Sequence, residues 1–369
     1  MCTNGRCFYV FKNGKKCTVK PEDYTIKILN VEDVVKKMPL LTDLDISRCN
    51  LTKIPELWKL KNLTYLNLSN NKLVSLPDTI GNLVKLKELR LSVNNLVSLP
   101  ATIGNLTELK LLTLDSNQLT SLPVTIGNLT ELELLNLDSN QLTSLTSLLA
   151  TIGNLAKLKE LILRNNESAS LPDTIGNLTQ LSVLDVTYNQ LTFLPDSIGN
   201  LTQLKKLDLA GNQLTSLPAT IGNLTQLKEL ILHCNEFASL PDTIGNLTQL
   251  SELDVSDNQL TFLPDSIGNL AQLKKLDLAG NQLTCLPINI GQMTQLSELN
   301  AMHNNLSSLP QSIHLEVIFD RQLLFLYGCS NYSTLVSKCV DQRKREVIYT
   351  KFLIDQRKRG YHRCRVAAS

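Results

Sequence analysis

The sequence predicts an α/β solenoid of twelve coils, in which each coil adds one strand to a parallel sheet. Three observations support this prediction. A pattern of the form L-x-x-L-x-L-x-x-N-x-L occurs twelve times, at steps of 22, 23 or 26 residues. Apolar and polar residues alternate inside each copy, and a motif L-P-x-x-I-G-N-L-x-x-L links one copy to the next. The first residues of the copies are Leu41, Leu63, Leu86, Leu109, Leu132, Leu158, Leu181, Leu204, Leu227, Leu250, Leu273 and Leu296.

Positions 3 to 6 of the pattern predict a short strand. In the copy that starts at Leu181, for example, the apolar Leu184 and Val186 flank the polar Asp185. Such alternation is typical of a strand with one buried face. Stacked copies would place these strands about 4.8 Å apart. Side chains at positions 3, 5 and 7 would then lie on the face that points away from the core.

Position 9 is asparagine in every copy but the first, which has Cys49. A buried asparagine can bond the backbone of the adjoining turn, so stacked copies predict a ladder of amides. These residues are Asn71, Asn94, Asn117, Asn140, Asn166, Asn189, Asn212, Asn235, Asn258, Asn281 and Asn304.

The linking motif predicts a 3-10 or short helical turn on the opposite side of each coil. Ile198, Leu201 and Leu204 are spaced by three residues, as on one face of such a turn. A glycine inside the motif, Gly199 in this copy, argues against a long helix.

These motifs resemble the leucine-rich repeat superfamily over residues 41–314. The 23-residue form with L-P-x-x-I-G-N-L is similar to its intracellular class, the Ras-suppressor and disease-resistance-like proteins. The resemblance implies a right-handed horseshoe with a parallel concave sheet, short 3-10 or helical convex segments, and recognition of partners on the concave side. A role in signalling is one of the many binding roles that this fold supports, and the resemblance alone implies it.

Four segments are expected. Residues 1–40 would form an N-terminal cap, with a hairpin around Asn13-Gly14 and a short helix that starts after Asn30. Residues 41–314 would form the solenoid, 315–340 an apolar C-terminal cap, and 341–369 a basic, poorly ordered tail. In the linking segment after Leu142, a three-residue Leu-Thr-Ser slip before Leu149 predicts a local bulge.

Charge is distributed unevenly. The chain has 36 Lys and Arg against 34 Asp and Glu, a formal charge of +2, but residues 341–369 carry 9 basic and 3 acidic side chains. At positions 3, 5 and 7 of the twelve copies, thirteen residues are acidic and four are basic. The expected concave face is therefore acidic, which favours a basic protein partner and disfavours nucleic acid at the repeat body.

We therefore expect a non-catalytic scaffold that binds a basic protein or peptide on the concave face. Apolar residues there would be anchors, and the acids would steer the partner. An alternative is that the acids only keep the surface soluble. The candidate partner-binding residues are Tyr65, Leu111, Asp115, Leu134, Asp138, Ile162, Arg164, Asp185, Tyr188, Asp208, Ile231, Asp254 and Asp277.

Enzyme chemistry is not expected. The four histidines lack partners at the spacing of a metal site or a catalytic triad, and no phosphate-binding loop or kinase signature occurs. We therefore expect no metal and no cofactor. Cys339-Val-Asp341 imitates the nucleophile motif of leucine-rich-repeat ubiquitin ligases from bacterial pathogens, but only 30 residues follow Cys339. A second hypothesis is the targeting module of a bacterial host-directed effector that acts through a separate catalytic chain.

The sequence predicts a cytoplasmic protein without a transmembrane segment, because the apolar run Cys7 to Phe11 is too short for a secretory leader. The basic tail contains Asp-Gln-Arg-Lys-Arg twice, at 341–345 and 355–359. Four interpretations stay open for it: a nuclear signal, contact with an anionic membrane or nucleic acid, folding back onto the acidic face, or no function.

Overall fold

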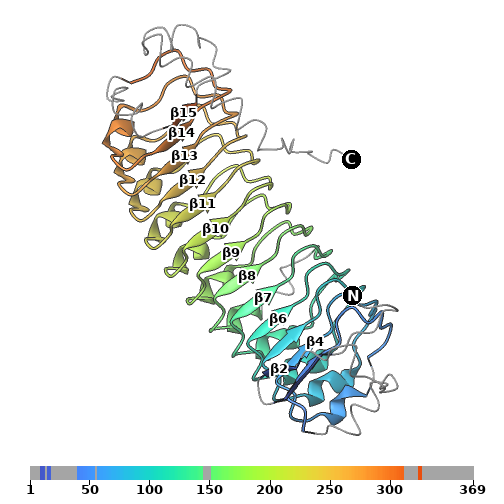
Figure 1. Ribbon diagram of the computed structural model, residues 1–369. Helices are drawn as coiled ribbons and strands as arrows, with labels where there is room; N and C mark the ends of the chain where they lie inside the picture. Colours follow the sequence, from blue (N-terminus) through green and yellow to red (C-terminus); the bar gives the residue numbers. More distant parts are fainter. Residues whose placement is uncertain are drawn as a thin grey trace. The chain divides into compact units, whose positions relative to one another are not determined.

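The computed structural model describes residues 9–12, 15–17, 40–54, 56–143, 151–310 and 323–325 (Figure 1). The chain forms two compact units, Met1–Gln190 and Leu191–Ser369. Each unit is a stack of coils in which short strands lie on one side and 3-10 helices on the other, as the sequence predicts (Figure 1).

The first unit contains a sheet with one three-residue strand per coil. Each strand from β3 to β9 pairs in parallel with the next, and position 3 of one coil lies opposite position 3 of its neighbour. The strands are β3 (Asp43–Asp45), β4 (Tyr65–Asn67), β5 (Glu88–Arg90), β6 (Leu111–Thr113), β7 (Leu134–Asn136), β8 (Glu160–Ile162) and β9 (Val183–Asp185).

A pair of antiparallel strands precedes this sheet. β1 (Tyr9–Lys12) pairs with β2 (Lys15–Cys17), and Lys12 lies opposite Lys15. This pairing on either side of Asn13-Gly14 agrees with the expected hairpin. β1 also pairs antiparallel with β3, so the hairpin extends the sheet beyond the first coil.

The second unit repeats the arrangement, and its strands from β10 to β15 pair in parallel in sequence order. These strands are β10 (Lys206–Asp208), β11 (Glu229–Ile231), β12 (Glu252–Asp254), β13 (Lys275–Asp277), β14 (Glu298–Asn300) and β15 (Leu323–Phe325). β15 follows the last of the twelve copies and lies in the segment that the sequence assigns to the C-terminal cap.

The linking segments form 3-10 helices rather than α-helices in the described part of the chain. In the first unit they are η2 (Leu57–Lys59), η3 (Asp78–Asn82), η4 (Ala101–Asn105), η5 (Val124–Asn128), η6 (Ile152–Asn154) and η7 (Asp173–Asn177). In the second unit they are η8 (Asp196–Asn200), η9 (Ala219–Asn223), η10 (Asp242–Asn246), η11 (Asp265–Asn269) and η12 (Ile288–Gln292).

Glycine inside these helices is required by the close approach of successive coils. A Cβ atom on Gly104 would lie 2.4 Å from the backbone oxygen of Thr125, in the next coil. The same conflict recurs at equivalent glycines, including Gly81 and Gly245. The glycine therefore sets how tightly the coils stack on the helical side.

Leucines and isoleucines of the repeat form the core between strands and 3-10 helices. Leu112 and Leu114 from one strand segment and Ile103 from the linking segment are fully buried. Burying one such side chain contributes about 1.5–3 kcal/mol, and every described coil buries several of them.

The predicted asparagine ladder is present and closes the turn after each strand. The Asn94 side chain donates to the carbonyl oxygens of Leu91 in its own coil and Leu68 in the preceding coil, both at 3.0 Å. Its Oδ1 accepts the backbone N–H of Leu73. In the first coil, where Cys49 replaces the asparagine, the backbone N–H of Cys49 donates to Asn71.

The residue just before each ladder asparagine, at position 8, has a positive φ in every described coil. Glycine occupies this position at Gly211 and Gly280, but other coils hold residues such as Asn70, Ser116 and Val93 in the same conformation. This tight left-handed turn was not anticipated from the sequence.

Several expectations fall outside the described residues. They are the bulge in the linking segment after Leu142 (residues 144–150), the short helix after Asn30, and the basic tail (residues 341–369).

Candidate protein-binding face

The strand face of the first unit, meaning the side chains at positions 3, 5 and 7 of β3–β9 and the residues that follow them, carries most of the predicted site. Leu111, Leu134 and Tyr65 lie at position 3, and Asp115 and Asp138 lie at position 7. Ile162, Arg164, Asp185 and Tyr188 belong to the last two coils of this unit, whereas Asp208, Ile231, Asp254 and Asp277 belong to the second unit.

Two neighbouring leucines form an apolar patch on this face. Leu111 on β6 lies directly opposite Leu134 on β7. Both are half-buried, although their position-4 neighbours Leu112 and Leu135 are fully buried. The position-3 residues on either side, Glu88 and Glu160, are acidic, so the two leucines form an apolar pair that is flanked by charge along the position-3 row.

Tyr65 adds an aromatic ring to the same row of residues. The guanidinium of Arg90 lies 5.6 Å from the centre of the Tyr65 ring, in a cation–π arrangement. Arg90 also pairs with Glu88 at 3.2 Å. Burial raises the pKa of the Tyr65 hydroxyl, and the nearby Arg90 opposes that shift.

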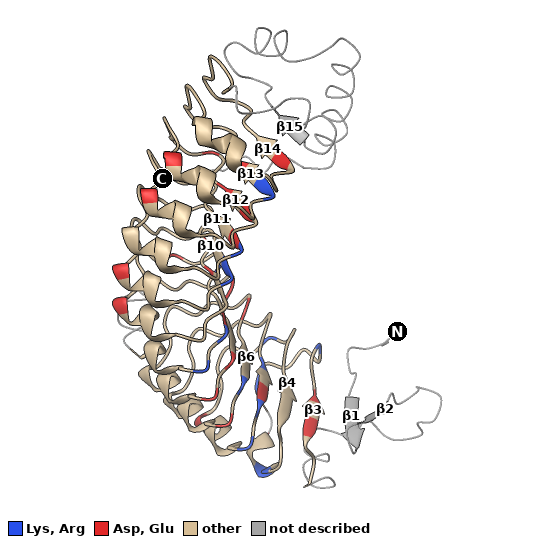
Figure 2. Ribbon diagram, turned by 90° about the vertical axis from the view of Figure 1, so that its left-hand side faces the viewer, with Lys and Arg blue, Asp and Glu red and all other residues tan. Residues whose placement is uncertain are grey.

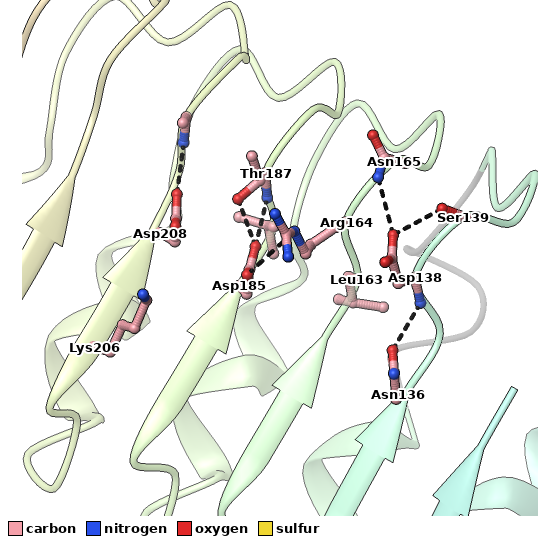
Figure 3. Close-up of polar contacts among 12 residues, drawn as sticks. Asn136, Asp138, Ser139, Leu163, Arg164, Asn165, Asp185, Thr187, Lys206 and Asp208 are labelled. Carbon is pink, nitrogen blue, oxygen red and sulfur yellow. Dashed lines mark hydrogen bonds and ion pairs between the residues drawn. The ribbon is translucent and has the colours of Figure 1, made fainter. Parts of the chain in front are cut away.

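Asp115 and Asp138 lie just beyond the strands that carry the two leucines. Asp115 accepts hydrogen bonds from the Ser92 hydroxyl at 2.6 Å and from the Asn136 amide at 3.2 Å. Asp138 accepts from Ser139 and from Asn165, both at 3.0 Å (Figure 3). None of these donors is a cation, so both carboxylates keep their negative charge uncompensated by these contacts.

Positive charge lies at the opposite ends of the same strands. Glu133 pairs with Lys159 at 2.7 Å and with Lys110 at 3.4 Å, and this network links three successive coils. The hydrogen bonds from Lys159 and then Lys110 lower the pKa of Glu133. The leucine pair is therefore bordered by carboxylates on one side and by a lysine-containing network on the other.

The acidic residues at position 5 have a structural role that sequence reasoning missed. The Asp254 side chain accepts the backbone N–H of Ser256 at 2.9 Å and its hydroxyl at 2.6 Å. Asn67 and Asn300 accept the equivalent backbone N–H with their side-chain oxygens. Position 5 thus provides a local acceptor that supports the turn. The remaining cases are Asp45, Asn136, Asp185, Asp208 and Asp277.

Asp185 is much less accessible than the sequence suggested. It is buried, with 7% of its surface exposed, and accepts both the backbone N–H and the hydroxyl of Thr187 (Figure 3). Arg164 reaches its second oxygen at 3.5 Å. These contacts give both Asp185 and Arg164 partners within the protein.

The second unit has its own polar strand face. Asp254 and Asp277 are directly opposite each other on β12 and β13, as the sequence predicts. Lys206 pairs with Glu229 at 3.2 Å. Ile231 is half-buried beside Asp254 on the next strand.

Acidic residues also lie on the 3-10 side of the coils, which the sequence analysis did not consider. Figure 2 shows acidic residues at the starts of several of these helices. They are Asp78 and Asp173 in the first unit and Asp196, Asp242 and Asp265 in the second. Negative charge is thus not confined to the strand face, and the leucine pair distinguishes that face better than charge does.

Two negative findings concern the described residues. No group of three or more histidine, cysteine or acidic residues among them has the arrangement of a metal site. Within the same ranges, the structure contains no helix of the length and apolar character that a membrane crossing requires.

A family profile described as a leucine-rich repeat region matches residues 26–161, 135–254 and 230–317. The chain belongs to the leucine-rich repeat family. Leucine-rich repeat proteins are typically non-catalytic binding scaffolds. Among curated proteins, none matches this sequence.

Several solved structures are similar to this leucine-rich repeat chain. A leucine-rich repeat protein of Leptospira interrogans is 36% identical, with a TM-score of 0.75 over 82% of this chain and 75% of that one. The Arabidopsis receptor kinase HAESA, solved with the peptide hormone IDA and a co-receptor, is 33% identical, with a TM-score of 0.67 over 85% of this chain and 53% of that one. An internalin of Listeria monocytogenes is 27% identical, with a TM-score of 0.59 over 78% of this chain and 86% of that one.

Proposed function

We propose that this protein is a non-catalytic interaction scaffold that binds a basic protein or peptide on the strand face of its first unit. The observation that carries the proposal is the pairing of Leu111 with Leu134 on adjacent strands. Both leucines are only half-buried, so part of their apolar surface stays in contact with water, unlike that of a core leucine. A partner that covers them would gain that burial.

The charges around the leucine pair support a basic partner. Asp115 and Asp138 follow the two leucine strands, and the side chains of Ser92, Asn136, Ser139 and Asn165, which donate hydrogen bonds to them, are all neutral. A lysine or arginine of the partner would find two uncompensated carboxylates there. Such charges act mainly on association rate and selectivity, whereas desolvated apolar anchors supply most of the affinity.

One of the similar structures gives independent support for a peptide-like partner. HAESA, which is 33% identical over 85% of this chain, was solved in complex with a peptide hormone. The sequence class that the chain resembles favours a cytoplasmic location and a role in signalling as part of this proposal.

The proposal is tested by partner capture followed by quantitative binding. Proximity labelling with the full chain identifies candidates, and each purified candidate is titrated against wild type and Leu111→Ser/Leu134→Ser. We expect the double variant to bind at least about tenfold more weakly, because two adjacent anchors are lost. Asp115→Asn/Asp138→Asn keeps the hydrogen-bond acceptors, so it should lower the association rate and weaken the salt dependence.

The matched control is Val84→Ser, which removes an exposed apolar side chain from a linking segment. It should leave binding unchanged. Wild-type affinity in the double leucine variant, for every captured partner, would contradict the proposal.

A further inference from the structure

Two exposed apolar side chains occupy the left-handed turn of the first unit, where they are conformationally costly. Val93 has φ 56° and Tyr188 has φ 52°. Both are well exposed, at 46% and 45%. Residues with a β-branched or bulky side chain rarely adopt this conformation, because the side chain approaches the backbone. Neither burial nor turn preference therefore explains these two residues.

Equivalent positions in other coils show what the turn itself favours. Position 8 is Asn70 and Asn165 in two coils of the same unit, and it is Gly211 and Gly280 in the second unit. The segment 227–295 closely repeats segment 158–226, and at the position of Tyr188 it has Asp257. Small or short polar residues thus occupy the turn in seven of the twelve coils, whereas Arg48, Cys234 and His303 occupy it in three others.

A strained residue that the fold does not need is a candidate for a contact with something outside the fold. The spacing of the two residues defines what that contact requires. Four successive parallel pairings connect the coil of Val93 to that of Tyr188. At about 4.8 Å per strand, the two residues lie about 19 Å apart, which an extended peptide spans with about six residues.

The residues between them at position 7 are charged. The backbone N–H of Val93 donates to the carbonyl of Asp115 at 2.8 Å, so Asp115 lies in the adjacent coil. Asp138 follows one coil further along. The third intervening coil carries the basic Arg164, which pairs with Asp185 within the protein. Asp115 and Asp138 are therefore the acidic residues between Val93 and Tyr188 at the C-terminal ends of the strands.

We propose that Val93 and Tyr188 are contact residues for an extended basic segment of the partner, with two apolar side chains about six residues apart and a lysine or arginine between them. The apolar side chains would cover Val93 and Tyr188, and the basic one would face Asp115 and Asp138. This inference rests on the proposed function, because it extends the leucine patch to the neighbouring turns.

The test uses the full chain and synthetic peptides in extended, proline-free sequences. The probe peptide has two leucines about six residues apart with an arginine midway, and its controls have a spacing of about three residues or a glutamate for the arginine. Fluorescence anisotropy measures each dissociation constant. Wild type should bind the probe peptide at least about tenfold more tightly than either control.

Val93→Asn and Tyr188→Asn make the decisive comparison, because each should increase the stability of the protein and weaken its binding to the probe peptide. Asparagine is already accepted in this turn at Asn70 and Asn165. Each change should raise the melting temperature by about 1–3 °C through relief of strain. Each should also weaken the binding of the probe peptide about tenfold. A purely structural role would raise stability and leave binding unchanged.

Val97→Asn is the matched control, since Val97 is an exposed valine in the same coil as Val93 but is not among the positive-φ residues. Val97→Asn should change neither the melting temperature nor the affinity for the probe peptide. Equal binding of all peptides, no binding of the probe peptide, or unchanged affinity in both variants would overturn this inference. Loss of binding in Leu111→Ser/Leu134→Ser with unchanged binding in the turn variants would overturn the inference and leave the proposed function standing.

Discussion

The side-chain oxygen of Asn94 accepts a hydrogen bond from the backbone nitrogen of Leu73, one coil away, at 3.1 Å. This bond satisfies the backbone N–H of Leu73, a residue that is fully buried. Because the same asparagine donates to carbonyls in two coils, one side chain joins the turn within a coil to the stacking between coils.

We expect Asn94→Ala to destabilise the protein by about 2–4 kcal/mol, since it leaves one buried N–H and two buried carbonyl groups without this partner. Urea unfolding followed by circular dichroism measures the change. Asn95→Ala is the control, because the Asn95 side chain is exposed; it should change stability by less than about 0.5 kcal/mol. Equal effects of the two substitutions would refute a special role for the ladder.

Gly104→Ala should destabilise the stack on its helical side. The new Cβ would lie 2.4 Å from the oxygen of Thr125 and 2.6 Å from its Cβ, so the coils must separate locally. We expect a loss of about 1–3 kcal/mol from overpacking, although alanine also restricts the unfolded chain. Thr107→Ala, at an exposed site in the same coil, is the control in thermal unfolding. A more stable Gly104→Ala protein would contradict the close approach of these coils.

Asp254 allows the charge of a position-5 residue to be separated from its role as an acceptor. Asp254→Ala removes the acceptor for both the N–H and the hydroxyl of Ser256, and should cost about 1–2 kcal/mol. Asp254→Asn keeps an oxygen there, as Asn67 and Asn300 do, and should cost less than about 0.5 kcal/mol. Thermal unfolding distinguishes the two. If asparagine is as damaging as alanine, charge rather than hydrogen bonding supports the turn.

The fold could be predicted from the sequence because each element has a periodic signal. The spacing of leucines predicts strands, the recurring asparagine predicts the ladder, and the three-residue spacing of Ile198, Leu201 and Leu204 predicts the 3-10 turn. Twelve copies of one pattern leave few other ways to bury the same residues. The structure confirms a strand in each of the twelve copies and 3-10 helices in the linking segments from η2 to η12.

The role of the strand carboxylates was harder to predict, because charge and hydrogen bonding share the same residues. The sequence contained part of the relevant signal: position 5 is aspartate or asparagine in eight of the twelve copies, as at Asp45 and Asn67, although Arg90, Thr113, Ile162 and Ile231 occupy it in the others. A position that needed negative charge would not accept the amide, whereas one that needs an oxygen acceptor takes either. Position 8 carried a signal of its own, because glycine, asparagine, aspartate or serine occupies it in seven of the twelve copies. Val93 and Tyr188 obscure that signal, since they are residue types that turns disfavour.

The stability of the folded protein should also depend on pH, through the carboxylate of Glu133. Its pKa lies below the ordinary value of 4.5, because Lys159 and Lys110 donate hydrogen bonds to it. A lowered folded-state pKa stabilises the protein above pH 4.5, and this stabilisation is lost as the pH falls through the folded-state value. Glu133→Gln should therefore lower the melting temperature near pH 7 by on the order of 1 °C, because both ion pairs are solvent-exposed.

The same variant should approach wild type as the pH falls through the lowered folded-state pKa of Glu133, because Glu133 then becomes protonated in wild type as well. Melting temperatures measured between pH 3 and pH 7, at low and high salt, test this expectation. Glu108→Gln, at an exposed glutamate one coil away, is the control and should give a curve parallel to wild type. A Glu133→Gln curve parallel to wild type over the whole range would show that the network linking the three coils adds no stability, because only a group with a shifted pKa can change the pH dependence of unfolding.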